Sequence, residues 1–338
     1  MTGQAEISVV MGVYNGASLV RETVESILHQ EGVTLELIAI DDGSTDESGN
    51  ILEQYAARDP RVRVIHQENQ GLTRALIRGC AEARASYIAR QDVGDSSHPR
   101  RLRLQKEALD ADRELAFVSC WTDFCGPEWE FLYCVKGTGR ASLPTSIISE
   151  SEEHGVIDGP ACHASVMFRT ESYKRAGGYR AEFRCGQDWD LWYRLAEVGK
   201  FQMIEQPLHK ARLVPDSISS YNKQEQAAAG NLSLEAMLLR RRGASDDEVL
   251  DRARRIPRSR SHQHASKAQA AWLYFIGECL RRNDDNRALD YFLKSIRAYP
   301  FIIKSWIKML EMSIRPRRLM ATAFHRSAAT DPREEEFS

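Results

Sequence analysis

Carboxylate side chains grouped in three short clusters are the residues of this sequence best suited to chemistry. Carboxylates on a turn can accept hydrogen bonds from a base or sugar, share a divalent ion, or take a proton from a hydroxyl group. These abilities point to reactions of sugars and of nucleotide diphosphates. The clusters are Asp41 with Asp42, Asp92 with Asp95, and Asp188 with Asp190.

The first two clusters each have a purely structural alternative. The run from Asp41 to Asp46 has the composition of a strand-to-helix turn, in which a carboxylate or hydroxyl caps the helix. Asp92 and Asp95 also fit a solvated turn. As ligands, however, their hard oxygens suit Mg²⁺ or Mn²⁺, which would neutralise a leaving diphosphate. The structural and functional roles of a cluster can coexist.

The third cluster lies near the start of an expected amphipathic helix at about residues 187–195. A helix N-terminus stabilises a nearby acidic side chain, which is the structural alternative for Asp188. Asp188 and Asp190 are two residues apart, so on a helix they point in different directions. We therefore expect one of them to act as a general base while the other is structural.

The elements that position these clusters alternate along the chain. Apolar runs at residues 7–13, 35–40, 62–66, 87–89 and 115–121 predict strands, and amphipathic helices are expected between them. This alternation predicts a mostly parallel sheet flanked by helices. Ligands of such sheets bind at the carboxyl ends of the strands, which is where the first two acidic clusters fall.

Seven motifs, taken in order and spacing, resemble the family 2 glycosyltransferases over about residues 5–220. Each motif alone is weak, because turns of this composition occur by chance. They are Val10 to Asn15, Asp41 to Asp46, Asn69 to Leu72, Arg90 to Asp95, His163 to Arg169, Gly177 to Tyr179, and Gln187 to Trp192.

The resemblance implies a GT-A fold, which is Rossmann-like, and an inverting transfer of a sugar from a nucleotide-diphosphate sugar to an acceptor hydroxyl. It makes Tyr14 the aromatic residue against the base. It makes Asp41 and Asp42 the carboxylates that hold the base and ribose, and Asp92 a residue of the donor site. Asp188 matches the base that deprotonates the acceptor, as an inverting reaction requires.

The resemblance further implies a Mn²⁺ or Mg²⁺ ion, held here by Asp92 and Asp95. Two departures from the family pattern affect this ion. Gly94 stands where the family has its second Asp, and Val214 stands where it often has a His. Either Asp95 reaches the ion in place of the lost Asp, or the ion is held more weakly. Asp216 or Arg212 would partly replace the lost His.

Three further residues are candidates for the site, although for each of them a purely structural role is at least as well supported as a functional one. Arg74 could meet the donor phosphates, although a solvated helix face explains it as well. His163 and Trp189 are expected on the acceptor side. A hydrogen-bonded structural histidine and a core aromatic residue are their respective alternatives.

The second part of the chain differs in charge and in pattern. Residues 226–338 carry 21 basic and 14 acidic side chains, and residues 1–225 carry 25 and 34. We expect a catalytic domain over residues 1–224, an all-α region over 225–330, and a disordered acidic tail over 331–338. A unit like a tetratricopeptide repeat is expected near residues 267–310, with Trp272 and Trp306 one 34-residue period apart.

Several expectations concern partners and location. The donor is expected to be a UDP-sugar and the acceptor a glycan or a lipid-linked glycan, in bacterial polysaccharide or surface-glycan synthesis. The basic and apolar residues 301–318 suit an interfacial membrane helix, with a repeat-type packing helix as the alternative. No nucleic-acid motif accompanies the basic residues. The helical region offers a route to oligomers.

No apolar run is long enough to span a bilayer, and no secretory signal is evident at the start. Seven cysteines without paired spacing favour a reducing cytoplasm as the location of the protein. Within the cytoplasm, we expect peripheral contact with the inner face of the cell membrane. The rival function is a non-catalytic nucleotide-sugar-binding scaffold that works through its helical region. A nucleotidyltransferase is disfavoured, because the turn after the first strand lacks an Arg and a Lys.

Overall fold

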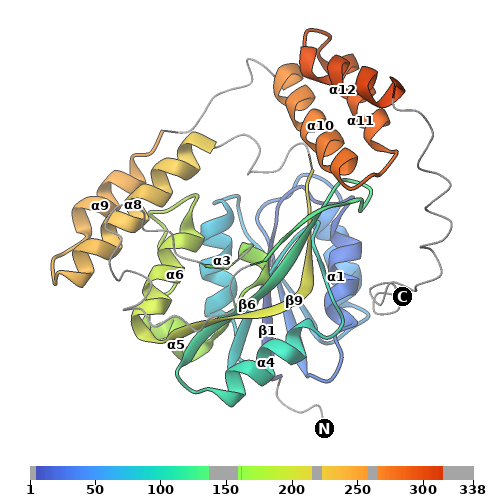
Figure 1. The fold of residues 1–338 in the computed structure, drawn as a ribbon. Helices are drawn as coiled ribbons and strands as arrows, with labels where there is room; N and C mark the ends of the chain where they lie inside the picture. Colours follow the sequence, from blue (N-terminus) through green and yellow to red (C-terminus); the bar gives the residue numbers. More distant parts are fainter. Residues whose placement is uncertain (1–4, 137–158, 161, 215–222, 258–264, 315–338) are drawn as a thin grey trace. The chain divides into compact units, whose positions relative to one another are not determined.

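The computed structural model describes residues 5–136, 159–160, 162–214, 223–257 and 265–314 (Figure 1). Contacts between residues divide the chain into two units. The first comprises residues 1–125, 134–213 and 221–259, and the second comprises residues 126–133, 214–220 and 260–338. The acidic tail at 331–338 and Asp216 lie outside the described residues.

Parallel strands form the first half of a nine-stranded sheet, as the sequence predicts. Its order is β3-β2-β1-β4, and each neighbouring pair is parallel. In the register, Val13 pairs with Asp41 and Gly12 pairs with Asp92, so both acidic clusters lie at the carboxyl ends of strands beside β1. The strands are β1 (Ile7–Val13), β2 (Leu35–Asp41), β3 (Val62–His66) and β4 (Tyr87–Asp92).

The second half of the sheet is mixed, in the order β8-β6-β9-β5. Strand β8 runs antiparallel to both β4 and β6, β6 and β9 are parallel, and β5 is antiparallel to β9. Only the first half is therefore fully parallel. The strands are β5 (Ser96–Ser97), β6 (Leu115–Cys125), β8 (Met167–Arg169) and β9 (Lys200–Arg212), with β7 (Phe131–Val135) also in the sheet.

Both faces of the sheet are buried. The side chains of Val9 and Met11 in β1 pack with helices α1, α2 and α4, whereas Val10 packs with α3 and α6 on the opposite face. This division follows from the two-residue period of a strand, which sends successive side chains to opposite faces. The helices are α1 (Val20–Leu28), α2 (Ser48–Ala56), α3 (Leu72–Ala81), α4 (Arg101–Ala111), α5 (Thr170–Arg175) and α6 (Gln187–Val198).

Helices α8 (Lys223–Arg241) and α9 (Asp247–Arg254) belong to the first unit. Phe183 is fully buried in a small core with residues of both helices. The sequence changes in charge and pattern near residue 225. The boundary between the two units, however, lies near residue 259, so the two changes do not coincide. The members of this core are Phe183, Ala229, Leu232, Ala236, Val249 and Ala253.

The second unit contains α10 (Ala265–Arg282), α11 (Ala288–Ala298) and α12 (Ile303–Ile314). Helices α10 and α11 pack closely, with Ile276 and Phe292 fully buried. The hydroxyl of Ser295 donates to the carbonyl of Ala270 at 2.7 Å and lies 2.8 Å from the hydroxyl of Ser305. This helical arrangement agrees with the repeat-like unit expected from the sequence. Within the described residues, no helix is long and apolar enough to cross a bilayer.

Candidate active site

The loops that follow β1 and β2 are joined by hydrogen bonds. The backbone N–H of Asn15 donates to Oγ of Ser44 at 3.0 Å, and the side-chain oxygen of Asn15 accepts from the N–H of Thr45 at 2.8 Å. Asn15 adopts a positive φ of 50°, which Asn tolerates better than most residues. Tyr14, immediately before it, is 55% exposed, so its ring is available to a ligand.

Asp41 is buried at the end of β2 and organises the turn that follows. Its Oδ1 accepts from the N–H of Ser44 at 3.1 Å, and its Oδ2 lies 2.8 Å from Nδ1 of His66. The other ring nitrogen of His66 lies 2.8 Å from Glu53, and these hydrogen bonds to Glu53 and then Asp41 raise the pKa of His66. The structural role considered for Asp41 is therefore present.

Asp42 receives hydrogen bonds at the start of α3. Its Oδ1 accepts from Nε2 of Gln67 at 2.6 Å and from the N–H of Gln70 at 2.9 Å, and its Oδ2 accepts from the N–H of Gly71 at 2.8 Å. A carboxylate in this position satisfies N–H groups that the helix leaves open. Arg74, further along the same helix, is exposed to solvent.

Asp92 pairs with a buried arginine two residues earlier. Nη2 of Arg90 donates to Oδ1 of Asp92, and Nη1 of Arg90 donates to the carbonyls of Val10 and Gln91. Burial opposes ionisation of Asp92, but the charge of Arg90 lowers its pKa. The Asp92 side chain is 35% exposed, whereas that of Arg90 is 1% exposed, so the carboxylate is the part that a ligand can reach.

The turn after Asp92 requires a glycine. Gly94 has a φ of +96°, and a Cβ atom there would lie 3.2 Å from Cδ1 of Leu19. The N–H of Gly94 donates to Oγ1 of Thr23 at 2.9 Å, and Oγ1 of Thr23 donates to the carbonyl of Asp95 at 3.0 Å. The turn is thus fixed against α1 in a conformation that an L side chain rarely adopts.

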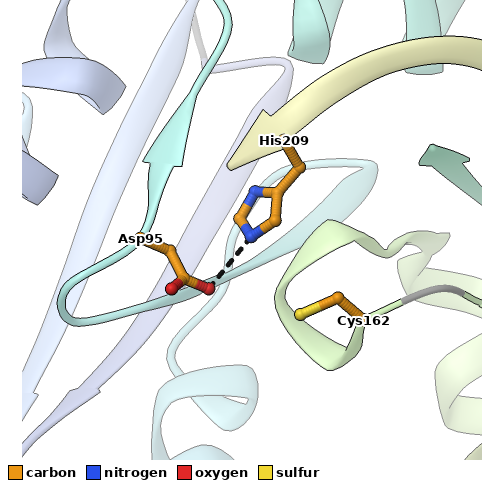
Figure 2. A group of neighbouring side chains, drawn as sticks. All are labelled: Asp95, Cys162 and His209. Carbon is orange, nitrogen blue, oxygen red and sulfur yellow. Dashed lines mark hydrogen bonds and ion pairs between the residues drawn. The ribbon is translucent and has the colours of Figure 1, made fainter. Parts of the chain in front are cut away.

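Figure 2 shows Asp95, Cys162 and His209 gathered at one point, and their ligand atoms lie within 4.8 Å of one another. Nε2 of His209 lies 3.0 Å from Oδ2 of Asp95, and the backbone N–H of Arg212 donates to Oδ1 of Asp95 at 3.1 Å. Sequence analysis missed His209 and Cys162. His209 lies five residues before Val214, inside β9, and no local motif distinguishes it from a core residue.

The proton on His209 is fixed by a buried arginine. Nη1 of Arg101 lies 3.0 Å from Nδ1 of His209. Arginine has no acceptor atom, so Nδ1 accepts this bond and the ring proton is on Nε2, from which it is donated to Asp95. Burial, together with the charge of Arg101, keeps the pKa of His209 well below its usual range. His209 is therefore a neutral group that holds Asp95 in place.

The ligand atoms of Asp92, Asp95, Cys162 and His209 suit a hard divalent ion only in part. Carboxylate oxygens of Asp92 and Asp95 suit Mg²⁺ or Mn²⁺. Burial, reinforced by the charges of Asp95 and Asp92, raises the pKa of the Cys162 thiol well above its usual range, and a neutral thiol is a poor ligand for such ions. In this arrangement the imidazole of His209 orients a carboxylate and is not itself an open ligand.

His163 and Tyr179 connect the two acidic regions. Nε2 of His163 lies 2.8 Å from the hydroxyl of Tyr179. Burial lowers the pKa of His163, and the charge of Arg90 lowers it further, while Asp188 and Asp92 both act in the opposite direction. The ring centroid of His163 lies 6.5 Å from that of Trp192, so His163 lies beside α6, the helix that carries Asp188 in its first turn.

Asp188 and Asp190 have different surroundings, as the helix period predicts. Asp188 lies in the first turn of α6 and is half-buried, whereas Asp190 is fully buried and pairs with Arg180 and Arg194. The expectation that one of the two is structural is thus met by Asp190. Trp189 is half-buried, with its ring centroid 5.1 Å from that of Trp192 and 6.2 Å from that of Tyr193.

Comparison with known proteins supplies the family. Residues 8–171 match the model of the glycosyl transferase family 2. EpsE of Bacillus subtilis (strain 168), a protein named as a glycosyltransferase, is 33% identical over 225 residues, which are 63% of this chain and 74% of the relative. The chain belongs to glycosyltransferase family 2. The family 2 match covers the strands and turns that carry Asp41, Asp42, Asp92 and Asp95.

One further relative of this family 2 glycosyltransferase is a much larger protein. The chondroitin synthase of Pasteurella multocida (strain Pm70) is 26% identical over 223 residues, which are 65% of this chain and 22% of the relative. Among solved structures, residues 1–349 of TarS from S. aureus, determined in complex with UDP, match with a TM-score of 0.51 and 16% identity over 90% of this chain and 88% of that one. This likeness establishes the GT-A fold.

Two family 2 positions are changed, and the structure gives a reason for one of them. At Gly94 the left-handed backbone favours the glycine over the family's Asp. The side chain of Val214 is half-buried. The residue before it, Leu213, donates its N–H to the carbonyl of Cys125 at 2.8 Å. Arg212, considered as a replacement for the missing His, directs Nη2 to Glu22 at 2.5 Å.

Proposed function

We propose that this family 2 glycosyltransferase transfers a sugar, of the hexosyl type, from a nucleotide-diphosphate sugar to an acceptor hydroxyl with inversion at the anomeric carbon. The observation that carries the proposal is the environment of Asp188. It is a half-buried carboxylate in the first turn of α6, a helix whose Trp192 ring lies 6.5 Å, centroid to centroid, from that of His163, while its neighbour Asp190 is held by two arginines.

The proposed chemistry assigns a task to each side of the site. The carboxylate of Asp188 accepts the proton of the acceptor hydroxyl as the oxygen attacks the anomeric carbon. Inversion requires this base on the face opposite the leaving diphosphate, so no covalent enzyme intermediate forms. His163 and Trp189 would line the acceptor side. His163 is neutral there and can orient a hydroxyl group without adding charge.

The donor would be a UDP-sugar bound at the carboxyl ends of β1, β2 and β4. The exposed ring of Tyr14 would lie against the base, with Asp41 and Asp42 holding the base and ribose. Both of these carboxylates already accept hydrogen bonds from the loops, which keeps them in position. Both oxygens of Asp41 and Oδ2 of Asp42 each retain a further lone pair for a ligand, whereas Oδ1 of Asp42 already accepts two bonds. Arg74, exposed on α3, would approach the phosphates. The TarS structures with UDP and UDP-GlcNAc support this choice of donor.

A Mn²⁺ or Mg²⁺ ion would be held by the carboxylates of Asp92 and Asp95, with His209 and the backbone of Arg212 orienting Asp95. Such an ion supplies Lewis-acid neutralisation of the leaving diphosphate. Arg90 already neutralises part of the charge on Asp92, so we expect weak binding of the ion. Mn²⁺ should therefore strengthen donor binding only modestly.

Polysaccharide or surface-glycan synthesis in bacteria is the proposed setting, with a glycan or a lipid-linked glycan as acceptor. The bacterial glycosyltransferases and the chondroitin synthase among the relatives support it. Catalysis is assigned to residues 1–224, braced by α8 and α9, and residues 225–330 would contact partners or a second copy. All seven cysteines lie in the described part of the chain and none of them forms a disulfide there, in keeping with the proposed cytoplasmic location.

Nucleotide sugars screened by thermal shift, with Mn²⁺ and then with a chelator, test the proposal. A ligand that binds only the folded state raises the melting temperature, so the correct base and sugar should stand out. The selected donor is then tested for transfer to glycan acceptors, with the anomeric configuration of the product read by NMR. Donor binding without transfer or hydrolysis for any donor would favour the rival scaffold function, for which Gly94 and Val214 are the sequence evidence.

A further inference from the structure

Helix α12 presents an apolar face to solvent. Ile303, Trp306, Ile307 and Leu310 follow the spacing of one helical face, and Phe301 lies two residues before the helix begins. A single exposed apolar residue is ordinary, but five in one place indicate a contact surface. We call these five residues the α12 face. Their exposed fractions are 78% for Phe301, 70% for Ile303, 43% for Trp306, 48% for Ile307 and 54% for Leu310.

The opposite side of α12 already packs against its own unit. Ser305 is fully buried, and its hydroxyl lies 2.8 Å from that of Ser295 in α11. Nε1 of Trp306 donates to the carbonyl of Pro300 at 2.9 Å, which fixes the indole ring at the edge of the face. The α12 face therefore points away from the side of the helix that packs on α11, and the described residues of this unit leave it exposed.

The charge of the chain segment that contains α12 indicates which kind of partner could cover the α12 face. Residues 301–318 carry five basic side chains and one acidic one, a net charge of +4. Lys308 is offset by Glu311 at 2.8 Å, while Lys304 is exposed next to Ile303. A second copy docked on this face would bring two such basic segments together, which costs Coulomb energy. An anionic surface would instead be attracted.

We propose that the α12 face binds the surface of a membrane rich in anionic lipid. The apolar side chains enter the headgroup and acyl boundary while Lys304, which is exposed beside them, meets lipid phosphates. Trp306 suits this depth, because an indole ring combines an apolar body with a polar N–H. The helix has 12 residues, which is too short to span a bilayer and long enough to lie in its interface.

This contact goes beyond the proposed glycosyl transfer and does not depend on it. It would hold the second unit at the surface where a lipid-linked acceptor is found. A membrane contact of this kind depends on burial of apolar side chains and on electrostatic attraction to anionic lipid. It should therefore weaken when either the α12 face or the lipid charge is removed.

Sedimentation of the full chain with vesicles tests the proposal. The vesicles are phosphatidylcholine alone or an equimolar mixture with phosphatidylglycerol. Ile307→Glu disrupts the α12 face, and Phe131→Glu is the matched control. Phe131 belongs to the same unit, is 43% exposed and is not part of the face. Thermal unfolding shows whether both variants retain the fold.

We expect the chain to bind the mixed vesicles, with binding weakened by salt and by omission of phosphatidylglycerol. Ile307→Glu should weaken binding at least about tenfold, since it places a charge where an apolar side chain enters the lipid. Phe131→Glu should change it less than about twofold. Equal binding of both variants would overturn the proposal. So would no binding to the mixed vesicles, or a dimer in light scattering that Ile307→Glu abolishes. Since no donor or acceptor is present, failure here is separate from failure of the proposed function.

Discussion

Nη2 of Arg194 lies 2.6 Å from Oδ2 of Asp190, one turn earlier on α6. Arg180 pairs with the same carboxylate, which is fully buried, so Asp190 is fully occupied in holding the helix. Asp188, two residues earlier, is half-buried and acts electrostatically on His163. The helix period thus gives these two carboxylates, which are two residues apart, different surroundings, and the proposed chemical task belongs to Asp188 alone.

Asp188→Asn should lower the turnover of glycosyl transfer by about 10²- to 10⁴-fold, the usual contribution of a general base. The amide has the same shape but cannot accept the proton. Donor affinity should stay within a factor of about two, because donor binding is assigned to other residues. Transfer kinetics and calorimetric titration of the donor measure the two quantities. Near-normal turnover would remove Asp188 from the mechanism.

Asp190→Asn should destabilise the fold. Its loss of charge leaves Arg180 and Arg194 facing a neutral amide, and breaking a buried ion pair typically costs about 3–5 kcal/mol. Urea denaturation measures the free energy of unfolding. Asp188→Asn is the matched control and should change it far less. If the two variants unfold alike, Asp190 does not have the structural role described here.

The stabilising effect of His66 should depend on pH. Hydrogen bonds to Glu53 and Asp41 raise the pKa of His66 above its ordinary value of 6.5, so the folded state favours the protonated ring. This stabilisation is fully present below pH 6.5 and is lost as the pH rises through the raised pKa.

The measurement compares the urea unfolding of the unchanged chain and of His66→Gln across neutral pH. The unchanged chain should be the more stable at about pH 6, and the difference should shrink toward about pH 9. A difference that is constant, or that grows with pH, would show that the proton on His66 does not matter. His29, an exposed histidine of the same unit, provides the control variant His29→Gln.

Gly94→Asp, which restores the family's acidic residue, should destabilise the chain. At a φ of +96° a side chain is strained, and the cost is on the order of 1–3 kcal/mol. Gly94→Ala carries the same backbone cost without the carboxylate and separates the two effects. Unfolding free energy and Mn²⁺ titration are measured for both. A large gain in Mn²⁺ affinity at unchanged stability would contradict the account of this turn.

The sequence predicted much of the fold because its signals are local. The strands at residues 7–13 and 62–66 agree with β1 and β3 at both ends, because each apolar run ends at polar turn residues. Strand β4 extends three residues past the predicted end, through Arg90, Gln91 and Asp92. Polar residues in a buried strand carry no local signal of burial.

The candidate site was predictable where carboxylates follow strands in sequence. Asp41, Asp42 and Asp92 were selected as candidates in this way, and the register of β1 with its neighbours brings them to one edge of the sheet. Asp188 was selected from its place at the start of an expected helix and from the family resemblance. The partners of these residues were not predictable. Arg90, Arg101 and His209 are buried polar residues whose role depends on distant segments.

By itself, the sequence determined the order of strands and helices, the glycosyltransferase motifs and the basic surplus after residue 225, since each is a property of residue type and spacing. The tertiary structure decided which carboxylates are already paired. His209 reaches Asp95 across 114 positions of sequence, and Arg180 crosses ten positions to Asp190. It also decided that α12 turns Ile303 and Ile307 outward, because Ser305 packs against α11. Such pairings depend on how segments are brought together, and no local pattern records them.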